Sequence, residues 1–191
     1  MKNLKIYLYL FIITGFFYPL IITLIGQLAL PYKANGSFVL SNKKVVGTEL
    51  IAQKFEKKEY FWPRPSSINY KPLPSSGSNL APTSKELKSL VEARRKKWTE
   101  EVNITPFTNK KFYKVPAELL YASGSGIDPH ISIRAAFFQM ARIVKARPGL
   151  DEVILKKIIV ENIEVKHFVL DPYVNVLKLN ILLDQRYPIH E

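Results

Sequence analysis

Apolar residues are concentrated at the start of the chain, where 25 consecutive residues from Ile6 to Leu30 contain no Asp, Glu, Lys, Arg or His. A helix of that length is about 37 Å long and can cross a hydrocarbon core of about 30 Å with some tilt. A cleavable signal peptide is the competing interpretation, but its apolar stretch is about 7–15 residues long and ends in small residues. Because Gln27 to Pro31 has no Ala-x-Ala pattern, we expect residues 1–32 to be an uncleaved membrane anchor that spans the lipid bilayer.

One face of this expected helix carries four positions spaced 4, 3 and 4 residues apart, namely Gly15, Pro19, Ile22 and Gly26. Glycines allow close approach of another helix backbone. Pro19 leaves a carbonyl without its intrahelical donor, a defect that packing against neighbouring helices compensates in membranes. Two interpretations stay open here. The face packs against a partner helix, or its Gly and Pro only reflect their raised frequency in membrane helices.

The rest of the chain, residues 33–191, mixes patterns of strands, loops and helices. Residues 36–46 look extended on either side of the turn-prone Ser41-Asn42. Between Tyr60 and Pro82 five prolines exclude a regular element. The same stretch contains Trp62 and other large apolar residues, so we expect a long loop packed onto the domain rather than a flexible linker.

Helical spacing begins after this loop. Thr83 and Glu86 have the spacing of a capping box and predict a helix over residues 84–101. A second helix is expected after Ser132, with an apolar face and an end at Pro148-Gly149. Its face is formed by Ile133, Ala136, Phe137, Met140 and Val144.

The C-terminal segments complete the pattern. Asp151 is placed to cap a third helix that runs to about Glu164. Residues 173–183 are ambiguous, because Asp171-Pro172 resembles a helix start while residues 174–179 partly alternate like a strand. We favour a helix there. The predicted fold class is α+β, a single N-terminal transmembrane helix followed by one mixed domain.

Composition narrows the possible chemistry. The chain has 28 Lys and Arg against 16 Asp and Glu, a formal net charge of +12, and no Cys. The absence of Cys excludes disulfides, Cys-bearing zinc sites and thiol catalysis. The longest basic run is Arg94 to Lys97, and no aromatic residues interleave with it in a base-stacking pattern. We therefore interpret it as a solvated helix face and expect no nucleic-acid partner.

The richest polar stretch is the loop from Ser123 to Ser132. A serine hydrolase using Ser125, Asp128 and His130 is the alternative function that this loop suggests. A nucleophile elbow needs glycine two residues before and after the serine, whereas Ser125 has Ser123 and Ile127 there. Catalysis is therefore the weaker interpretation of the loop.

A structural role explains the same loop. Its glycines permit positive φ in a tight turn, and Asp128 and Ser132 are placed to cap the following helix. A Gly-rich turn before a helix can also present N–H groups to an anion. Weak binding candidates are thus Ser123, Gly124, Ser125, Gly126, Asp128 and His130. No resident cofactor and no metal is expected, because His130, His167 and His190 lack ligand spacing.

Several motifs resemble one known family in their order along the chain. They are Tyr18-Pro19-Leu20, Ala34-Asn35-Gly36-Ser37, Tyr60-Phe61-Trp62-Pro63-Arg64-Pro65-Ser66, Ser76-Gly77-Ser78-Asn79-Leu80, Ala122-Ser123-Gly124-Ser125-Gly126-Ile127-Asp128-Pro129-His130-Ile131-Ser132 and Val174-Asn175-Val176-Leu177. With them the chain resembles the C subunits of bacterial Kdp potassium-transporting P-type ATPases. Residues 162–168 depart from the family, which has a His-Thr and a Gly-containing turn there, so details of that loop do not transfer.

The resemblance implies an accessory subunit of a high-affinity, ATP-driven potassium importer. Its partners would be a KdpA-like potassium-conducting subunit and a KdpB-like ATPase subunit, with ATP acting at the level of the complex. The family is described as a catalytic chaperone, and a role in assembly or as a cover over the ion entrance suits the topology better. The resemblance also implies the bacterial inner membrane, a cytoplasmic N-terminus and an extracytoplasmic domain over residues 33–191. The nearly balanced lysines around the span lean only slightly the same way.

Overall fold

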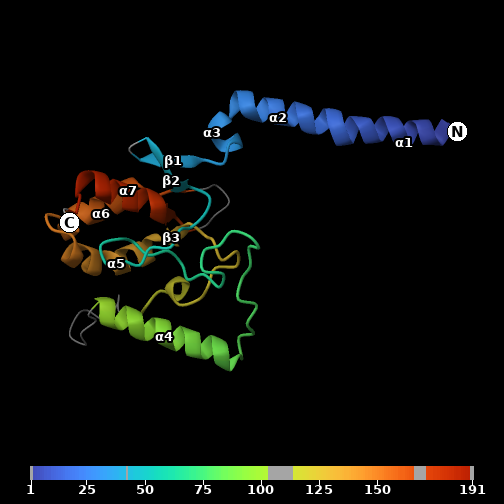
Figure 1. Ribbon diagram of the computed structural model, residues 1–191. Helices are drawn as coiled ribbons and strands as arrows, with labels where there is room; N and C mark the ends of the chain where they lie inside the picture. Colours follow the sequence, from blue (N-terminus) through green and yellow to red (C-terminus); the bar gives the residue numbers. More distant parts are fainter. Residues whose placement is uncertain (1, 42, 103–113, 166–170, 190–191) are drawn as a thin grey trace. The chain divides into compact units, whose positions relative to one another are not determined.

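The computed structural model describes residues 2–41, 43–102, 114–165 and 171–189 and divides into two compact units, Met1–Thr48 and Glu49–Glu191 (Figure 1). The first unit contains α1 (Lys2–Ile12), the π-helical turn η1 (Ile13–Phe17), α2 (Tyr18–Ala29), α3 (Pro31–Ala34), β1 (Phe38–Ser41) and β2 (Lys44–Thr48). The second contains α4 (Lys85–Val102), the 3₁₀ turn η2 (Ala117–Leu119), β3 (His130–Ser132), α5 (Ile133–Ala146), α6 (Glu152–Glu161), β4 (Tyr173–Asn175) and α7 (Val176–Arg186). The predicted α+β class with one N-terminal apolar helix is confirmed.

The apolar N-terminal segment is one long helix. Residues Asn3–Ala29 form 27 helical residues, whose most apolar stretch of 18 residues has a mean hydropathy of 2.2 and no residue buried within the chain. The helix is therefore long and apolar enough to cross a membrane. It ends at Ala29, one residue before the predicted end at Leu30.

A π-helical turn interrupts this helix directly before its proline. In η1 the Tyr18 N–H donates to the Ile13 carbonyl, an i→i−5 bond. Pro19 has no N–H to donate and its ring crowds the preceding turn. Local π adjustments are a recognised way to accommodate proline in a membrane helix. The chain thus adapts to Pro19 within its own backbone, whereas the sequence suggested only help from neighbouring helices.

The first unit ends in a two-stranded antiparallel hairpin. β1 and β2 pair from Phe38 opposite Thr48 to Ser41 opposite Lys44, with a register irregularity after Val39. This confirms the extended segments expected over residues 36–46. Asn42, at the predicted turn, lies outside the described residues. The compact unit that contains the long helix extends to Thr48 and therefore includes the hairpin. The domain boundary predicted after residue 32 stays a prediction.

Helix α5 is central to the second unit, since it contacts α4, α6 and both strands of the β3–β4 pair. Its predicted face is largely right, because Ala136 and Met140 are buried. Around α5 lies a hydrophobic core to which every described helix of the unit contributes, together with the proline-rich stretch and β4. Its residues include Trp62, Trp98, Leu119, Ile143, Leu155, Ile159, Val174, Leu179 and Leu183. This core holds the domain together.

The proline-rich stretch over residues 60–82 contains neither helix nor strand, as predicted, and its first residues are buried. Two side-chain amides replace the missing secondary structure. Asn180 accepts the Phe61 N–H at 2.8 Å and donates to the Phe61 carbonyl at 3.0 Å. Gln139 does the same for Trp62, at 2.8 and 3.0 Å. Both buried peptide groups are thereby satisfied, so the packed-loop prediction is confirmed.

Two buried arginines hold the segment immediately before this loop. Arg142 donates to the Lys58 and Tyr60 carbonyls, and its burial lowers the pKa of the guanidinium to about 10. Arg147, with no exposed side-chain surface, donates to the Glu59 carbonyl at 3.3 Å and to the Tyr187 carbonyl at 2.7 Å. The fork of a guanidinium suits this binding of several carbonyls.

The helix starts confirm two of the predicted caps. Ser132 accepts the Ala135 N–H at the start of α5, and Asp151 accepts the Ile154 N–H at 2.7 Å at the start of α6. The capping box at Thr83 is wrong by one residue. Ser84 is the residue before α4, and its hydroxyl accepts the Leu87 N–H at 3.3 Å.

The C-terminal segment contains both of the alternatives that the sequence left open. Its first three residues form β4 and the following ones form α7. Asp171-Pro172 is not the helix start, because Asn175 caps α7 by accepting the Lys178 N–H at 3.2 Å. Helix α6 ends at Glu161, three residues before the predicted Glu164.

Candidate functional site

The loop from Ser123 to Ser132 is held by the proline-rich stretch. The buried Ser123 donates its N–H to the Pro65 carbonyl at 3.0 Å, and the Ser75 hydroxyl donates to the Ser125 carbonyl at 2.8 Å. On its other side, the Ile127 carbonyl accepts the Ala52 N–H at 2.8 Å. The loop is therefore hydrogen-bonded to two segments that both lie far before it in the sequence.

Glycines make this junction possible. Gly126 has φ +73°, and a Cβ there would lie 2.6 Å from the Ser76 carbonyl oxygen. A Cβ on Gly77 would lie 2.9 Å from the Gly124 carbonyl oxygen. No L side chain fits at these distances. Gly124 itself has neither a positive φ nor a neighbour within 4 Å of such a Cβ, so the prediction of positive φ is right for Gly126 alone.

Asp128 is the electrostatic centre of the loop. Its carboxylate accepts from Arg64 Nη1 at 3.0 Å and from the His130 N–H at 3.0 Å, with His130 Nδ1 3.6 Å away. Burial alone would raise the pKa of Asp128, but the His130 hydrogen bonds and the Arg64 charge outweigh it and hold the pKa below its usual value. The predicted helix cap is wrong for Asp128, since it binds Arg64 and His130 while Ser132 alone caps α5.

The three residues of the hydrolase alternative do not form a triad. The exposed Ser125 hydroxyl accepts the Ile127 N–H at 3.2 Å, and within the described part of the chain no hydrogen bond joins it to His130 or Asp128. The His130 ring instead contacts the Tyr173 ring edge-to-face, with 4.6 Å between centroids. A nucleophile needs a base within hydrogen-bond reach, and this arrangement does not supply one.

Beside this loop lies an open, acid-lined pocket of about 380 Å³. Its polar lining comes from Glu118, Asp128, His130, Ser132, Asp171 and Tyr173. Glu118 is occupied by Ser132, whose N–H and hydroxyl both donate to it. Among the described residues no group of three or more His, Asp or Glu is arranged to hold a metal ion. His167 and His190 lie outside the described residues.

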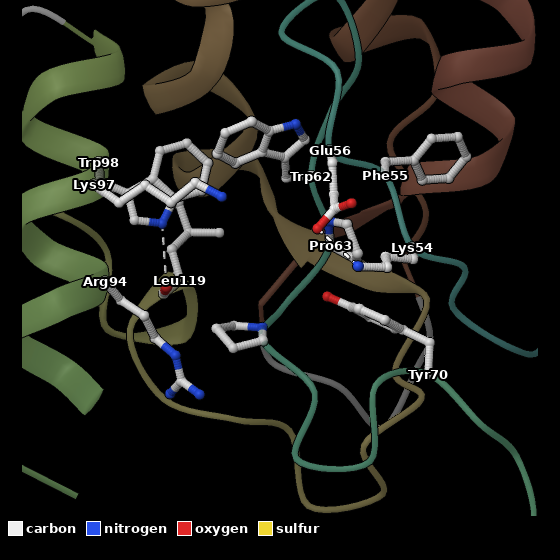
Figure 2. A pocket seen from close by; sticks show the side chains of 11 residues that line it. Lys54, Phe55, Glu56, Trp62, Pro63, Tyr70, Arg94, Lys97, Trp98 and Leu119 are labelled. Carbon is white, nitrogen blue, oxygen red and sulfur yellow. Dashed lines mark hydrogen bonds and ion pairs between the residues drawn. The ribbon is translucent and has the colours of Figure 1, made fainter. Parts of the chain in front are cut away.

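A second pocket, of about 180 Å³, lies between α4 and the start of the proline-rich stretch (Figure 2). Trp62 and Trp98 form one wall, with ring centroids 5.0 Å apart. Tyr70 forms another, and its burial raises the pKa of the phenol to about 12. Its charged lining is a Lys54–Glu56 ion pair at 2.8 Å, with Arg94 and Lys97.

The basic run on α4 is more than a solvated face. Arg95 and Lys96 are exposed as expected. Arg94, however, donates to the Leu120 carbonyl at 2.7 Å, and burial lowers the pKa of its guanidinium. The Lys97 ammonium lies 4.2 Å from the centre of the Trp62 ring, a cation–π contact. The local sequence could not reveal this cation–π contact, because Trp62 precedes the basic run by more than thirty residues.

In the span, three of the four positions proposed for partner packing are exposed, and Gly26 is half-buried. Gly15 belongs to η1, whereas Pro19, Ile22 and Gly26 belong to α2. A Cβ on Gly15 would have no neighbour within 4 Å, and one on Gly26 would meet only the Ala34 Cβ at 3.8 Å. The chain itself therefore leaves open space at Gly15, whereas at Gly26 an added Cβ would be in ordinary van der Waals contact with Ala34.

Comparison with known proteins identifies the family. The family described as KdpC: K+-transporting ATPase, c chain, matches residues 1–185. A protein named Potassium-transporting ATPase KdpC subunit from Leptospira interrogans is 41% identical over 98% of this chain and 94% of its own length. Proteins of the same name from Synechocystis sp. and Caldanaerobacter subterraneus are 42% and 37% identical, over 93% and 100% of this chain and 93% and 96% of their own lengths. The chain therefore belongs to the KdpC family and is a KdpC subunit of a potassium-transporting ATPase, a component of a potassium import complex.

Proposed function

We propose that this chain is the accessory subunit that helps a KdpA-like potassium-conducting subunit and a KdpB-like ATPase subunit assemble, and that its span is the main contact. The observation that carries the proposal is a 27-residue apolar helix whose most apolar 18 residues are not buried, with open space at Gly15 and room for a Cβ beside Ala34 at Gly26. In lipid, such a surface gains little from burial of leucines and much from close packing at small residues. Another membrane helix is the natural occupant.

The chemistry of the chain supports an accessory role. Its sequence contains no Asp-Lys-Thr-Gly phosphorylation motif. No triad is formed by Ser125, Asp128 and His130. Their loop instead forms hydrogen bonds with Pro65 and Ser75 of the proline-rich stretch. The Kdp partners would therefore supply ion conduction and ATP hydrolysis, while this chain contributes packing surface.

Family membership, together with the slight lean of the lysines around the span, supports a proposed topology. Lys2 and Lys5 would lie in the cytoplasm and residues 33–191 outside it, in the bacterial inner membrane. Protease added to intact spheroplasts tests this orientation. Digestion of the large domain supports it, and full protection until lysis reverses it.

Copurification of the glycine variants tests the assembly role. Gly15→Leu adds volume where the chain itself has open space, and Gly26→Leu adds it beside Ala34, where a Cβ fits at 3.8 Å, so a loss of complex with both variants reports on a partner. The matched control is Leu24→Phe, which adds volume on the opposite face of α2. We expect the glycine variants to reduce recovery of the other Kdp subunits by about tenfold, equivalent to about 1.4 kcal/mol, and the control to match the unmodified chain. Normal recovery with both glycine variants would contradict the proposal.

A further inference from the structure

The β1–β2 hairpin exposes large apolar side chains on one face. Phe38, Leu40 and Val45 are 54%, 61% and 60% exposed. Leu40 is paired directly with Val45, and Phe38 lies two residues before Leu40. Because paired residues and residues two apart point to the same side of a sheet, all three lie on one face. A two-stranded hairpin with such a face is not stable alone in water and needs a covering surface.

The hairpin is fastened close to the end of the long helix. The Leu30 N–H donates to the Gly26 carbonyl at 2.9 Å, and the Asn35 amide donates to Gln27 Oε1 at 3.1 Å. The Ser37 N–H donates to the Tyr32 carbonyl at 3.0 Å. These bonds fold the connection between α2 and β1 back on itself. The hairpin therefore begins close to the C-terminal end of α2.

The charge of this unit has one sign. Before Glu49 the sequence contains five lysines and no Asp, Glu or Arg, so all 16 acids lie at Glu49 or after it. Lys33 follows the helix, and Lys43 and Lys44 stand at the tip of the hairpin. In the described part of the chain none of these three lysines forms an ion pair or a hydrogen bond through its ammonium group. An apolar face bordered by lysines matches the boundary between acyl chains and anionic headgroups.

We propose that the β1–β2 hairpin lies on the membrane surface, with Phe38, Leu40 and Val45 in the upper acyl region and Lys43 and Lys44 on the headgroups of anionic lipids. The span and the hairpin would then form an L-shaped anchor that limits tilting of the helix. This inference needs the helix Asn3–Ala29 to lie in the bilayer but does not depend on the assembly role. A Kdp partner covering the same face is the rival occupant.

Spin labels can locate the hairpin, because the chain has no Cys of its own. The full chain in nanodiscs containing phosphatidylglycerol would carry a single nitroxide at Leu40→Cys. Collision rates with oxygen, which concentrates in lipid, and with a water-soluble nickel chelate would be measured. The control is Val153→Cys on α6, since Val153 is an exposed apolar residue of the second unit, at 78% against 61% for Leu40. A label at Leu20→Cys, within α2, reports separately whether the helix is in the bilayer.

We expect the label at position 40 to collide at least about threefold more with oxygen, relative to nickel, than the label at position 153. If the label at position 20 lies in lipid while positions 40 and 153 give equal ratios, the proposal is wrong and the span stands. In the assembled complex, a label at position 40 that neither reagent reaches would show that a partner protein covers the face, which also overturns the proposal.

The lysines are tested in the same nanodiscs. Each lysine near an anionic surface contributes about fivefold to binding, so Lys43→Gln with Lys44→Gln should lower the oxygen preference at position 40. Replacing phosphatidylglycerol by phosphatidylcholine should lower it for the unmodified chain and leave the double variant unchanged. Equal responses of both chains to lipid charge would overturn the assignment of the lysines to headgroups.

Discussion

The two units of this chain are stabilised in different ways. The unit Met1–Thr48 has no acidic residue, and none of the 18 most apolar residues of its long helix is buried. The unit Glu49–Glu191 contains all 16 acids, a continuous core and buried polar side chains that are hydrogen-bonded. The second unit thus buries its own apolar side chains and pairs many of its buried polar ones. The first leaves its apolar side chains to its surroundings, as expected for a segment whose solvent is lipid and protein.

This difference predicts where a substitution changes the stability of the chain alone. A lost contact in the second unit should lower its free energy of unfolding, whereas a change on the span should leave that quantity intact and affect assembly. Both tryptophans, Trp62 and Trp98, are buried in the second unit. Their fluorescence therefore reports the unfolding of that unit in the full chain held in detergent micelles.

The largest expected effect comes from the core. Leu179 on α7 has no exposed surface, so Leu179→Ala should cost about 2–5 kcal/mol by leaving a cavity. Denaturant unfolding followed by tryptophan fluorescence measures it. Leu24→Ala in the exposed span is the contrasting variant and should change the result by less than about 0.5 kcal/mol. Equal losses in both would remove the distinction between the units.

The next effect concerns a buried guanidinium. Arg147→Met removes the donors to the Glu59 and Tyr187 carbonyls and to the Asp184 carboxylate. Leaving these acceptors without partners should cost about 2–4 kcal/mol in the same assay. Arg147→Lys keeps the positive charge but lacks the planar set of guanidinium donors, so it should recover only part of the lost free energy of unfolding. Full recovery by lysine would mean that charge, rather than carbonyl binding, is what matters there.

Substitution of two glycines, two residues apart, tests the structural role of the Ser123–Ser132 loop. Gly126→Ala combines a positive φ with a contact of 2.6 Å to the Ser76 carbonyl oxygen, and should cost about 1–3 kcal/mol. Gly124→Ala meets nothing within 4 Å and should be close to neutral. The comparison is made by thermal unfolding of the two variants. Equal stabilities would contradict the packed junction.

The smallest effect is a pH dependence at Asp128. A carboxyl whose pKa is lower in the folded protein stabilises it above the ordinary pKa of 3.8, and this contribution is lost as the pH falls through the folded pKa. Asp128→Asn cannot titrate. Its stability should therefore fall less steeply below about pH 4 than that of the unmodified chain, as measured by denaturant unfolding at a series of pH values. Parallel curves would show that the Arg64 and His130 contacts do not lower the pKa.

Local features were predictable from sequence because their partners lie within a few residues. The apolar run to Leu30, the caps at Ser132 and Asp151 and the break at Pro148-Gly149 all fall in this class. The span needs only length and hydropathy, and a cap needs only the next helical turn. These parts of the fold were predicted correctly for physical reasons that act over short distances.

Long-range polar contacts were not predictable in the same way. Gln139 and Asn180 have ordinary positions on helices, and nothing nearby in sequence shows that they bind the peptide groups of Trp62 and Phe61. Asp128 was expected to cap α5, but β3 separates it from that helix, and its carboxylate instead binds Arg64, which lies 64 residues earlier. Tertiary partners decide such roles, and a single sequence does not show which residues will meet.

The most direct test of the contrast between the units is the unfolding of the fragment Glu49–Glu191 without the first unit. If that unit holds itself together, the fragment should unfold cooperatively. Its midpoint, followed by the fluorescence of Trp62 and Trp98, should lie within about 5 °C of that of the full chain in micelles, a shift of about 1.5 kcal/mol or less. A broad transition, or a midpoint lower by about 15 °C or more, would show that the second unit depends on the span and would contradict the account.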